Sequence, residues 1–267
     1  RLPMSIVAAQ VSLALALMMV TGVLIRAMIA ERSVAFPYVG EQVLTMRIEL
    51  PEGKYPDEAQ RRQVFRELVA RVRGLPGVES AAWTSVRPNM VAELPSTTSF
   101  LIQGRPLEVP DRVPWAGFVV AEPEYFDLIN LGFRRGRNFD RRHTADSMPV
   151  AVINQAVADL HWPGEDPVGQ RFRLATEEPD ASWTTVIGVV ATLPDASPDV
   201  APRPVIYVPF EQGVNDSLGL LVEATGDSLA LAASVRNEVW AVDPDQPVDD
   251  IRTLAQIDAD DQADTRA

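Results

Sequence analysis

The sequence predicts an α+β protein: an N-terminal transmembrane helix followed by a folded region of two subdomains. Three observations carry this prediction. Residues 5–29 form a long apolar stretch, two β-α-β patterns stand far apart in the remaining chain, and the segment between them is rich in short strand-like runs. The alternation of strand and helix patterns is typical of a layered fold in which helices cover a sheet.

The apolar stretch predicts a membrane-spanning helix at residues 1–32, flanks included. No charged residue occurs between residues 6 and 25. At about 1.5 Å of rise per residue, this length covers the roughly 30 Å hydrocarbon core of a bilayer. The positive charges at Arg1, Arg26 and Arg32 lie on both flanks, so they do not decide the orientation.

Two other interpretations of this stretch are weaker. A cleavable signal peptide has a shorter apolar region, a basic start and a small-residue cleavage site, whereas here only Arg1 precedes the run. A buried helix of a globular core is seldom apolar on every face. We therefore expect the folded region to be attached to a membrane.

The composition excludes several classes of function. The 267 residues carry a net charge of -13, which disfavours nucleic acid, whose phosphates require lysine and arginine. The same charge disfavours flat docking on anionic lipid heads. The absence of cysteine excludes disulfides and thiol catalysis.

The first β-α-β pattern occupies residues 43–86. Residues 43–50 alternate between apolar and polar side chains, which predicts a half-buried strand with Leu44, Met46, Ile48 and Leu50 on its inner face. A helix is expected from an N-cap at Asp57 to about residue 73, with Gly74 as its C-cap. A second strand is expected at residues 78–86.

The second β-α-β pattern lies near the C-terminus. Residues 218–224 predict a strand, residues 226–228 a turn, residues 229–242 a helix and residues 246–251 a short strand. Two such units so far apart suggest one α/β sandwich whose sheet is completed late in the chain. We therefore assign residues 33–94 and 205–257 to one β-α-β type subdomain.

The segment between these parts, residues 95–204, predicts an inserted and mostly β subdomain. Its connections carry glycine and proline, and its strand candidates outnumber its two short helices at residues 123–129 and 155–162. The strand candidates are residues 100–103, 116–120, 150–154, 170–174 and 184–190.

Several motifs in this order resemble one known family. EPEYFDLINLG at residues 122–132 and RGRNF at 135–139 are similar to a stretch of the periplasmic core domain of MacB-like, FtsX-like ABC-transporter permeases. PVAVIN, WPGEDPVGQ and VIGVV, beginning at residues 149, 162 and 186, resemble the next three blocks of that family. PVIYVP at 204–209 and VDPDQPV at 242–248 resemble its closing blocks, and QVSLAL at residues 10–15 resembles the start of the preceding helix. Single blocks are weak motifs, but their common order makes the resemblance specific.

The resemblance implies a function that the residues alone do not show. It implies the extracytoplasmic domain of an ABC-type permease in a bacterial inner membrane, with the domain on the periplasmic side. The expected mechanism is mechanotransmission, in which ATP-driven motion of transmembrane helices moves the domain outside and drives substrate export or a periplasmic partner. The expected partners are an ABC ATPase subunit, a second permease copy or homologous half, and a periplasmic adaptor.

The resemblance also places the parts that move. Motion is expected about the connectors at residues 30–42 and after residue 251, and residues 258–267 are expected to lead into a further transmembrane helix. As a hypothesis, residues 87–98 contact a partner through exposed apolar side chains; a loop folded onto its own core is the alternative.

No motif for chemistry is found. The sequence lacks a G-x-x-x-x-G-K-[ST] phosphate loop, a G-x-S-x-G elbow and any zinc-type histidine spacing. His143 is expected to be solvated in a charged loop, His161 ends a short helix, and the acidic residues 258–264 are expected to be a solvated charge run. We predict no catalytic, cofactor-binding or metal-binding residue and no cofactor.

Two other classes of function remain open at this point. The main one is a membrane-anchored sensor or receptor that binds a small ligand in the cleft between the two subdomains. An anchored enzyme is the weaker one. An ATPase gene beside the complete reading frame, and further spans in that frame, would favour the permease.

Overall fold

The chain forms two compact units. They are Arg1–Ala35 with Pro194–Ala201, and Phe36–Leu193 with Pro202–Ala267. The computed structural model describes residues 12–15, 17–22, 37, 39–88, 97–105, 113–175, 182–194, 201–213 and 216–264.

The first unit contains the apolar N-terminal stretch. Residues 12–15 and 17–22 are helical, and their apolar side chains are exposed, with Leu13 at 64% and Met18 at 74%. Most of the transmembrane helix predicted at residues 1–32 lies outside the described residues. Within the described ones, we find no helix that combines enough length and apolar character to cross a membrane.

The second unit has a mixed α/β fold. Its strands are β1 (Val43–Glu49), β2 (Val78–Thr84), β3 (Thr97–Ile102), β4 (Trp115–Ala121), β5 (Phe133–Gly136), β6 (Val150–Asn154), β7 (Arg171–Leu174), β8 (Thr184–Val190), β9 (Val205–Pro209), β10 (Ser217–Ala224) and β11 (Asp249–Thr253). Its helices are α2 (Glu58–Arg73), α3 (Glu124–Leu128), α4 (Gln155–His161), α5 (Ala232–Val242) and α6 (Leu254–Asp264), with 3-10 turns η3 (Phe210–Gln212) and η4 (Ser228–Leu231).

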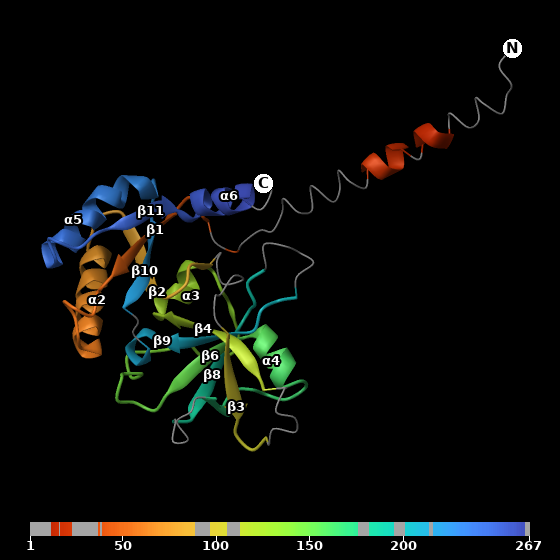
Figure 1. Ribbon diagram of the computed structural model, residues 1–267, viewed down its shortest axis with the longest axis horizontal. Coiled ribbons are helices and arrows are strands. Elements are labelled where there is room, and N and C mark those ends of the chain that lie inside the picture. Colours follow the sequence, from red (N-terminus) through yellow and green to blue (C-terminus); the bar gives the residue numbers. More distant parts are fainter. Residues whose placement is uncertain are drawn as a thin grey trace, which may run out of the picture. The chain divides into compact units, whose positions relative to one another are not determined.

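One 11-stranded sheet connects the described part of this unit (Figure 1). The strand order is β11-β1-β10-β2-β4-β3-β7-β8-β6-β9, and β5 pairs with β8. Strand β9 also pairs in parallel with β4, so the strands from β4 round to β9 close into a ring. The sheet therefore has an open part, β11-β1-β10-β2, joined to a closed part.

The open part is built from both ends of the unit. Residues 43–49 of β1 pair antiparallel with residues 217–223 of β10, and β10 pairs with β2. This confirms the prediction that the C-terminal segment completes the sheet begun by the N-terminal one. Such pairing between distant segments carries a larger loop-closure cost than local hairpins.

Helices α2 and α5 cover one face of the open part (Figure 1). The apolar face predicted for the first strand is confirmed, because its four residues, Leu44, Met46, Ile48 and Leu50, are all buried. They pack with residues from both helices, including Phe65 of α2 and Val239 of α5. Full burial of side chains of this size stabilises the fold by about 1.5–3 kcal/mol each.

The ends of α2 differ from the prediction in their details. Asp57 occupies the N-cap position with extended backbone angles, but its side chain makes no capping hydrogen bond. Gly74 is the C-cap residue in the right-handed region, and the left-handed glycine is Gly77 at φ 90°. The residue types therefore indicated where the helix ends but not the geometry of its caps.

The strands predicted within residues 95–204 are confirmed as β3, β4, β6, β7 and β8, and the two short helices as α3 and α4. Strands β5 and β9 and helix α6 were not predicted. The sheet runs from β2 into β4 at the pair Thr84↔Ala121, and the placement of a subdomain boundary near residues 95 and 204 stays a prediction.

Two glycines allow β5 to cross β8 closely. A Cβ atom on Gly136, which has φ 68°, would lie 2.2 Å from the backbone oxygen of Ile187. A Cβ atom on Gly188 would lie 2.4 Å from the backbone oxygen of Arg137. Neither position therefore has room for a Cβ atom.

Candidate functional site: the junction of the two connectors

The chain enters the sheet through an N-terminal connector, defined here as residues 37–42. The amide of Gln42 donates to the carbonyl of Val39 at 2.9 Å, which makes a turn immediately before β1. The Ser228 hydroxyl donates to the carbonyl of Glu41 at 2.7 Å. The amide of Ala224 donates to the carbonyl of Gln42 at 2.9 Å. The last two residues of this turn are therefore bonded to η4 and to β10.

The chain leaves the sheet through a C-terminal connector, defined here as β11 and α6. Helix α6 begins with a capping box, in which Thr253 and Gln256 satisfy each other's backbone N–H groups, both at 3.1 Å. Leu254 and Ile257 of the first turn are buried. The start of α6 is thus fixed by polar caps on one side and by apolar contacts on the other.

The two connectors contact each other directly. The amide of Ala255 in α6 donates to the carbonyl of Gly40 at 3.1 Å. A Cβ atom at Gly40 would lie 2.9 Å from the Ala255 nitrogen, closer than real Cβ atoms approach. Glycine at this position therefore lets the connectors meet backbone to backbone beside the β1–β11 pair.

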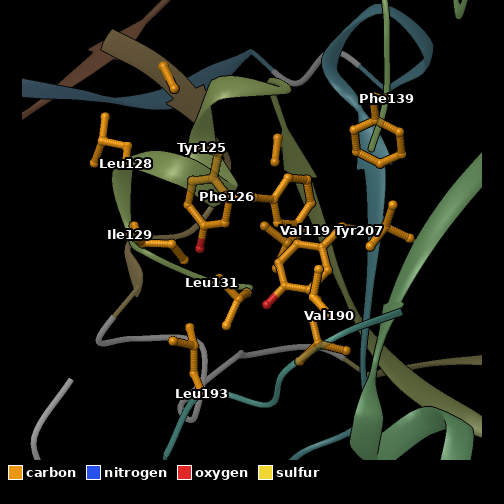
Figure 2. Close-up of a cluster of buried hydrophobic side chains, with 14 of the residues drawn as sticks. Val119, Tyr125, Phe126, Leu128, Ile129, Leu131, Phe139, Val190, Leu193 and Tyr207 are labelled. Atoms are coloured by element: carbon orange, nitrogen blue, oxygen red, sulfur yellow. The ribbon is translucent and has the colours of Figure 1, made fainter. Parts of the chain in front are cut away.

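A hydrophobic core lies behind this junction. Val43 and Leu254, one from each connector side, belong to the same buried cluster as Phe126 and Tyr207. Figure 2 shows Phe126 next to Tyr125 and Tyr207, and the Phe126 and Tyr207 ring centroids are 5.3 Å apart. Burial raises the pKa of the Tyr207 phenol. This cluster therefore joins the side chains behind the junction to those of the closed part of the sheet by dense packing.

A buried carboxylate lies where β2, β4 and α2 meet. An oxygen of Glu122 accepts from the Arg73 guanidinium at 2.9 Å and from the Trp83 amide at 3.0 Å. Burial raises the pKa of the Glu122 carboxyl to about 7, and the Arg73 charge opposes this increase. Arg73 also donates to the carbonyl of Ala81 and lies 3.2 Å from Glu124. The cluster joins the open and closed parts of the sheet.

The two histidines occupy different surroundings from one another. The expectation that His143 is solvated is wrong, because its side chain is buried. Its Nδ1 accepts a hydrogen bond from the Asp140 amide at 2.9 Å, and this bond holds the imidazole inside a tight turn. His161 ends α4 as predicted, and burial lowers its pKa. The described residues contain no group of three acidic or histidine side chains placed to hold a metal ion.

Two predicted surface segments have different outcomes. Most of the proposed partner loop, residues 87–98, lies outside the described residues. The acidic run at residues 258–264 is the second half of α6, and its Asp260 lies 3.0 Å from Arg252.

No catalytic or binding residue was predicted from the sequence, and the junction was predicted only as two separate connectors. The one residue that points to their contact is Gly40, because only glycine lets the two backbones approach so closely. The sequence alone does not show which element Gly40 approaches.

The fold and this junction define a mixed α/β domain whose two ends leave the sheet side by side. Residues 6–248 match the sequence profile of the MacB-like periplasmic core domain. The chain belongs to this family, which confirms the resemblance to MacB-like ABC-transporter permeases. No curated protein sequence matches the chain.

Solved structures share the fold at low identity. The periplasmic region of MacB from Actinobacillus actinomycetemcomitans has a TM-score of 0.54 and 13% identity, over 84% of this chain and 94% of that chain. A domain of a putative permease protein from Porphyromonas gingivalis has a TM-score of 0.45 and 16% identity, over 78% of this chain and 89% of that chain. The extracellular domain of the noncanonic ABC-type transporter YknZ from Gram-positive bacteria has a TM-score of 0.49 and 16% identity, over 78% of this chain and 100% of that chain. At these identities the likeness concerns the fold alone.

Proposed function

We propose that this chain is the extracytoplasmic domain of an ABC-type permease in a bacterial inner membrane and that it acts by mechanotransmission. In this proposal the segment at residues 1–32 spans the membrane, and residues 258–267 lead into a further span. An ABC ATPase subunit drives the helices, and the domain moves with them against a second permease copy, a transported substrate or a periplasmic adaptor. The proposal combines the family with the geometry of the junction.

The single observation that carries the proposal is the backbone contact between Gly40 and Ala255. Two membrane helices that reach the domain at one junction act on it together, so their motion turns the domain as a body. If the connectors entered at distant points, the same motion would strain the sheet instead.

The packing behind the junction supports transmission of force. Val43 and Leu254 share one buried cluster with the aromatic residues under α3. This cluster takes residues from the open and the closed parts of the sheet, among them Leu221 and Tyr207. A continuous core favours the permease over a ligand-binding sensor, since the sensor needs a cleft between two subdomains.

The test measures movement of the domain instead of transport, because movement requires no knowledge of the substrate. The chain has no cysteine, so a single Met148→Cys substitution at an exposed position accepts one fluorophore. The complete permease, with any cysteine outside these 267 residues replaced by serine, is reconstituted with its ATPase in vesicles that contain an acceptor lipid dye. Energy transfer is recorded before and after ATP addition. We expect an ATP-dependent change in transfer.

A flexible insertion provides the control for coupling. Gly-Ser-Gly-Ser placed after Pro37 behaves as a random coil and carries little torque. We expect it to leave ATP hydrolysis intact and to abolish the change in transfer. The same insertion after Gly104, an exposed turn, should leave the change intact. A wild-type protein that shows no ATP-dependent movement would refute the proposed function.

A further inference from the structure

Left-handed backbone is unevenly distributed over residue types in this protein. Among the described residues, glycine occupies most positions with positive φ, namely Gly77, Gly104, Gly136, Gly164 and Gly169. The non-glycine exceptions are Asn130 at φ 53° and Asp250 at φ 57°. A side chain in this region costs conformational energy that glycine does not, so each exception calls for a compensating role of the side chain.

Asn130 ends helix α3 in a Schellman motif. The amide of Leu131 donates to the carbonyl of Phe126 at 2.7 Å, and the amide of Asn130 donates to the carbonyl of Asp127 at 2.9 Å. Glycine is the usual residue at this left-handed position after a helix. The helix cap itself therefore does not need the asparagine side chain.

The Asn130 side chain instead reaches the N-terminal connector. Its Nδ2 donates to the carbonyl of Pro37 at 3.2 Å. This bond lies upstream of the turn that leads into β1, so it holds the connector against the α3–β5 corner before the chain enters the sheet.

Asp250 lies at an irregularity in the pairing of β11 with β1. The register shifts between Thr45 and Arg47, which leaves one extra residue on the β11 side. This is a β-bulge, and bulges with a left-handed residue usually have glycine there. The bulge itself therefore does not need the aspartate side chain.

The Asp250 carboxylate instead organises the C-terminal connector. It accepts from Arg252 Nε at 2.5 Å and from Arg87 Nη1 at 2.7 Å. Arg252 Nη1 in turn donates to Asp260 of α6 at 3.0 Å. Asp250 and Arg252 are each 35% exposed, so this chain of charges is partly shielded from solvent. It runs from the segment after β2, through the bulge, to the second turn of α6.

We propose that Asn130 and Asp250 are positioning residues that hold the N-terminal and C-terminal connectors at fixed angles to the body. At both positions the backbone favours glycine, and at both a polar side chain binds a connector. The inference rests on the proposed function, because fixed connector angles matter only if the connectors transmit movement. The competing explanation is that both are ordinary turn residues whose side-chain contacts carry no force.

Paired substitutions separate these explanations. Asn130→Gly and Asp250→Gly relax the backbone and remove the contact. Asn130→Asp and Asp250→Asn keep a residue that tolerates left-handed backbone, but the first loses the N–H donor and the second loses the charge. Gly104→Asn is the matched control, because it places asparagine at φ 79° in open space, away from both connectors.

The first measurement is urea unfolding, and the second is the ATP-dependent change in energy transfer from position 148. We expect both glycine variants to unfold close to the urea concentration of wild type, because the relaxed backbone offsets the lost contacts. The change in transfer should be about fivefold smaller in Asn130→Gly, the factor that follows from losing one hydrogen bond of about 1 kcal/mol, and at least as much smaller in Asp250→Gly, which loses two. The isosteric variants should show the same loss. Gly104→Asn should lower the urea midpoint and leave the change in transfer intact.

A third measurement follows the N-terminal connector alone. A nitroxide at Val39→Cys, an exposed position, should gain mobility in Asn130→Gly and Asn130→Asp and keep wild-type mobility in Gly104→Asn. Variants of Asn130 and Asp250 that move as far as wild type, in a permease that does respond to ATP, overturn the inference and leave the proposed function standing. A permease without any response overturns the proposed function and this inference with it.

Discussion

Replacing Glu122 by glutamine should change how stability depends on pH. The carboxyl titrates near pH 4.5 when unfolded and near 7 when folded, because burial disfavours its charged form. Between these values the folded state binds the proton more tightly than the unfolded state. The contribution of Glu122 to stability is therefore fully present below about pH 4.5 and is lost as the pH rises through 7.

The size of the effect follows from the difference in pKa. A shift of this size corresponds to about 3 kcal/mol, since each unit is worth about 1.4 kcal/mol. Glutamine stays neutral and can still accept from Arg73 and Trp83, so it does not lose this amount. Between pH 5 and pH 8 the free energy of unfolding of wild type should therefore fall by about 2.5 kcal/mol relative to that of Glu122→Gln.

Urea denaturation followed by tryptophan fluorescence measures this difference at several pH values. Every other titrating group contributes equally to both proteins, so only the difference between them is interpreted. Glu124→Gln is the matched control, because Glu124 lies 3.2 Å from the same guanidinium with its side chain 45% exposed. A Glu122→Gln difference that stays constant over this range would show that the burial argument is wrong.

Three further predictions concern packing. Gly40→Ala should destabilise the chain by about 1–3 kcal/mol and speed hydrogen exchange in α6, because the new methyl group meets the backbone nitrogen of that helix. Gly136→Ala should cost about 4 kcal/mol or more, because the Cβ atom meets the Ile187 oxygen at a position with positive φ. Gly132→Ala, with open space around it, is the control for both and should change the urea midpoint little. Phe126→Ala should cost about 3–5 kcal/mol in thermal or urea unfolding, through the cavity it leaves under α3.

Much of the fold could be predicted from local patterns. The alternation at residues 43–50 and the helical stripe of α2 depend on a half-buried surface of fixed period, and both were predicted with nearly correct bounds. Pairing of the two ends of the domain followed from the repeated β-α-β pattern. In both β1 and α2 the predicted apolar face, which includes Leu44 and Phe65, lies against one core.

The elements that were missed depend on tertiary contacts. Strand β5 has three exposed residues and exists because Gly136 and Gly188 let it approach β8. Strand β9 is buried at most positions, so its sequence shows no alternation. Helix α6 has an acidic second half that resembles a solvated tail, and its start depends on the capping pair of Thr253 and Gln256.

The junction and the buried position of His143 were missed for a similar reason. A glycine in a short connector and a histidine among arginines carry no sequence signal of their surroundings. Only the tertiary structure shows that Gly40 faces α6 and that His143 closes a turn on Asp140.

The pairing of β1 with β10 has a consequence for biogenesis. During synthesis, residues 43–49 emerge long before residues 217–223, so the edge of β1 has no permanent partner until nearly the whole domain has been made. An unpaired apolar strand is prone to pair wrongly with other chains. Folding of this domain should thus leave β1 open to wrong pairing until residues 217–223 are available.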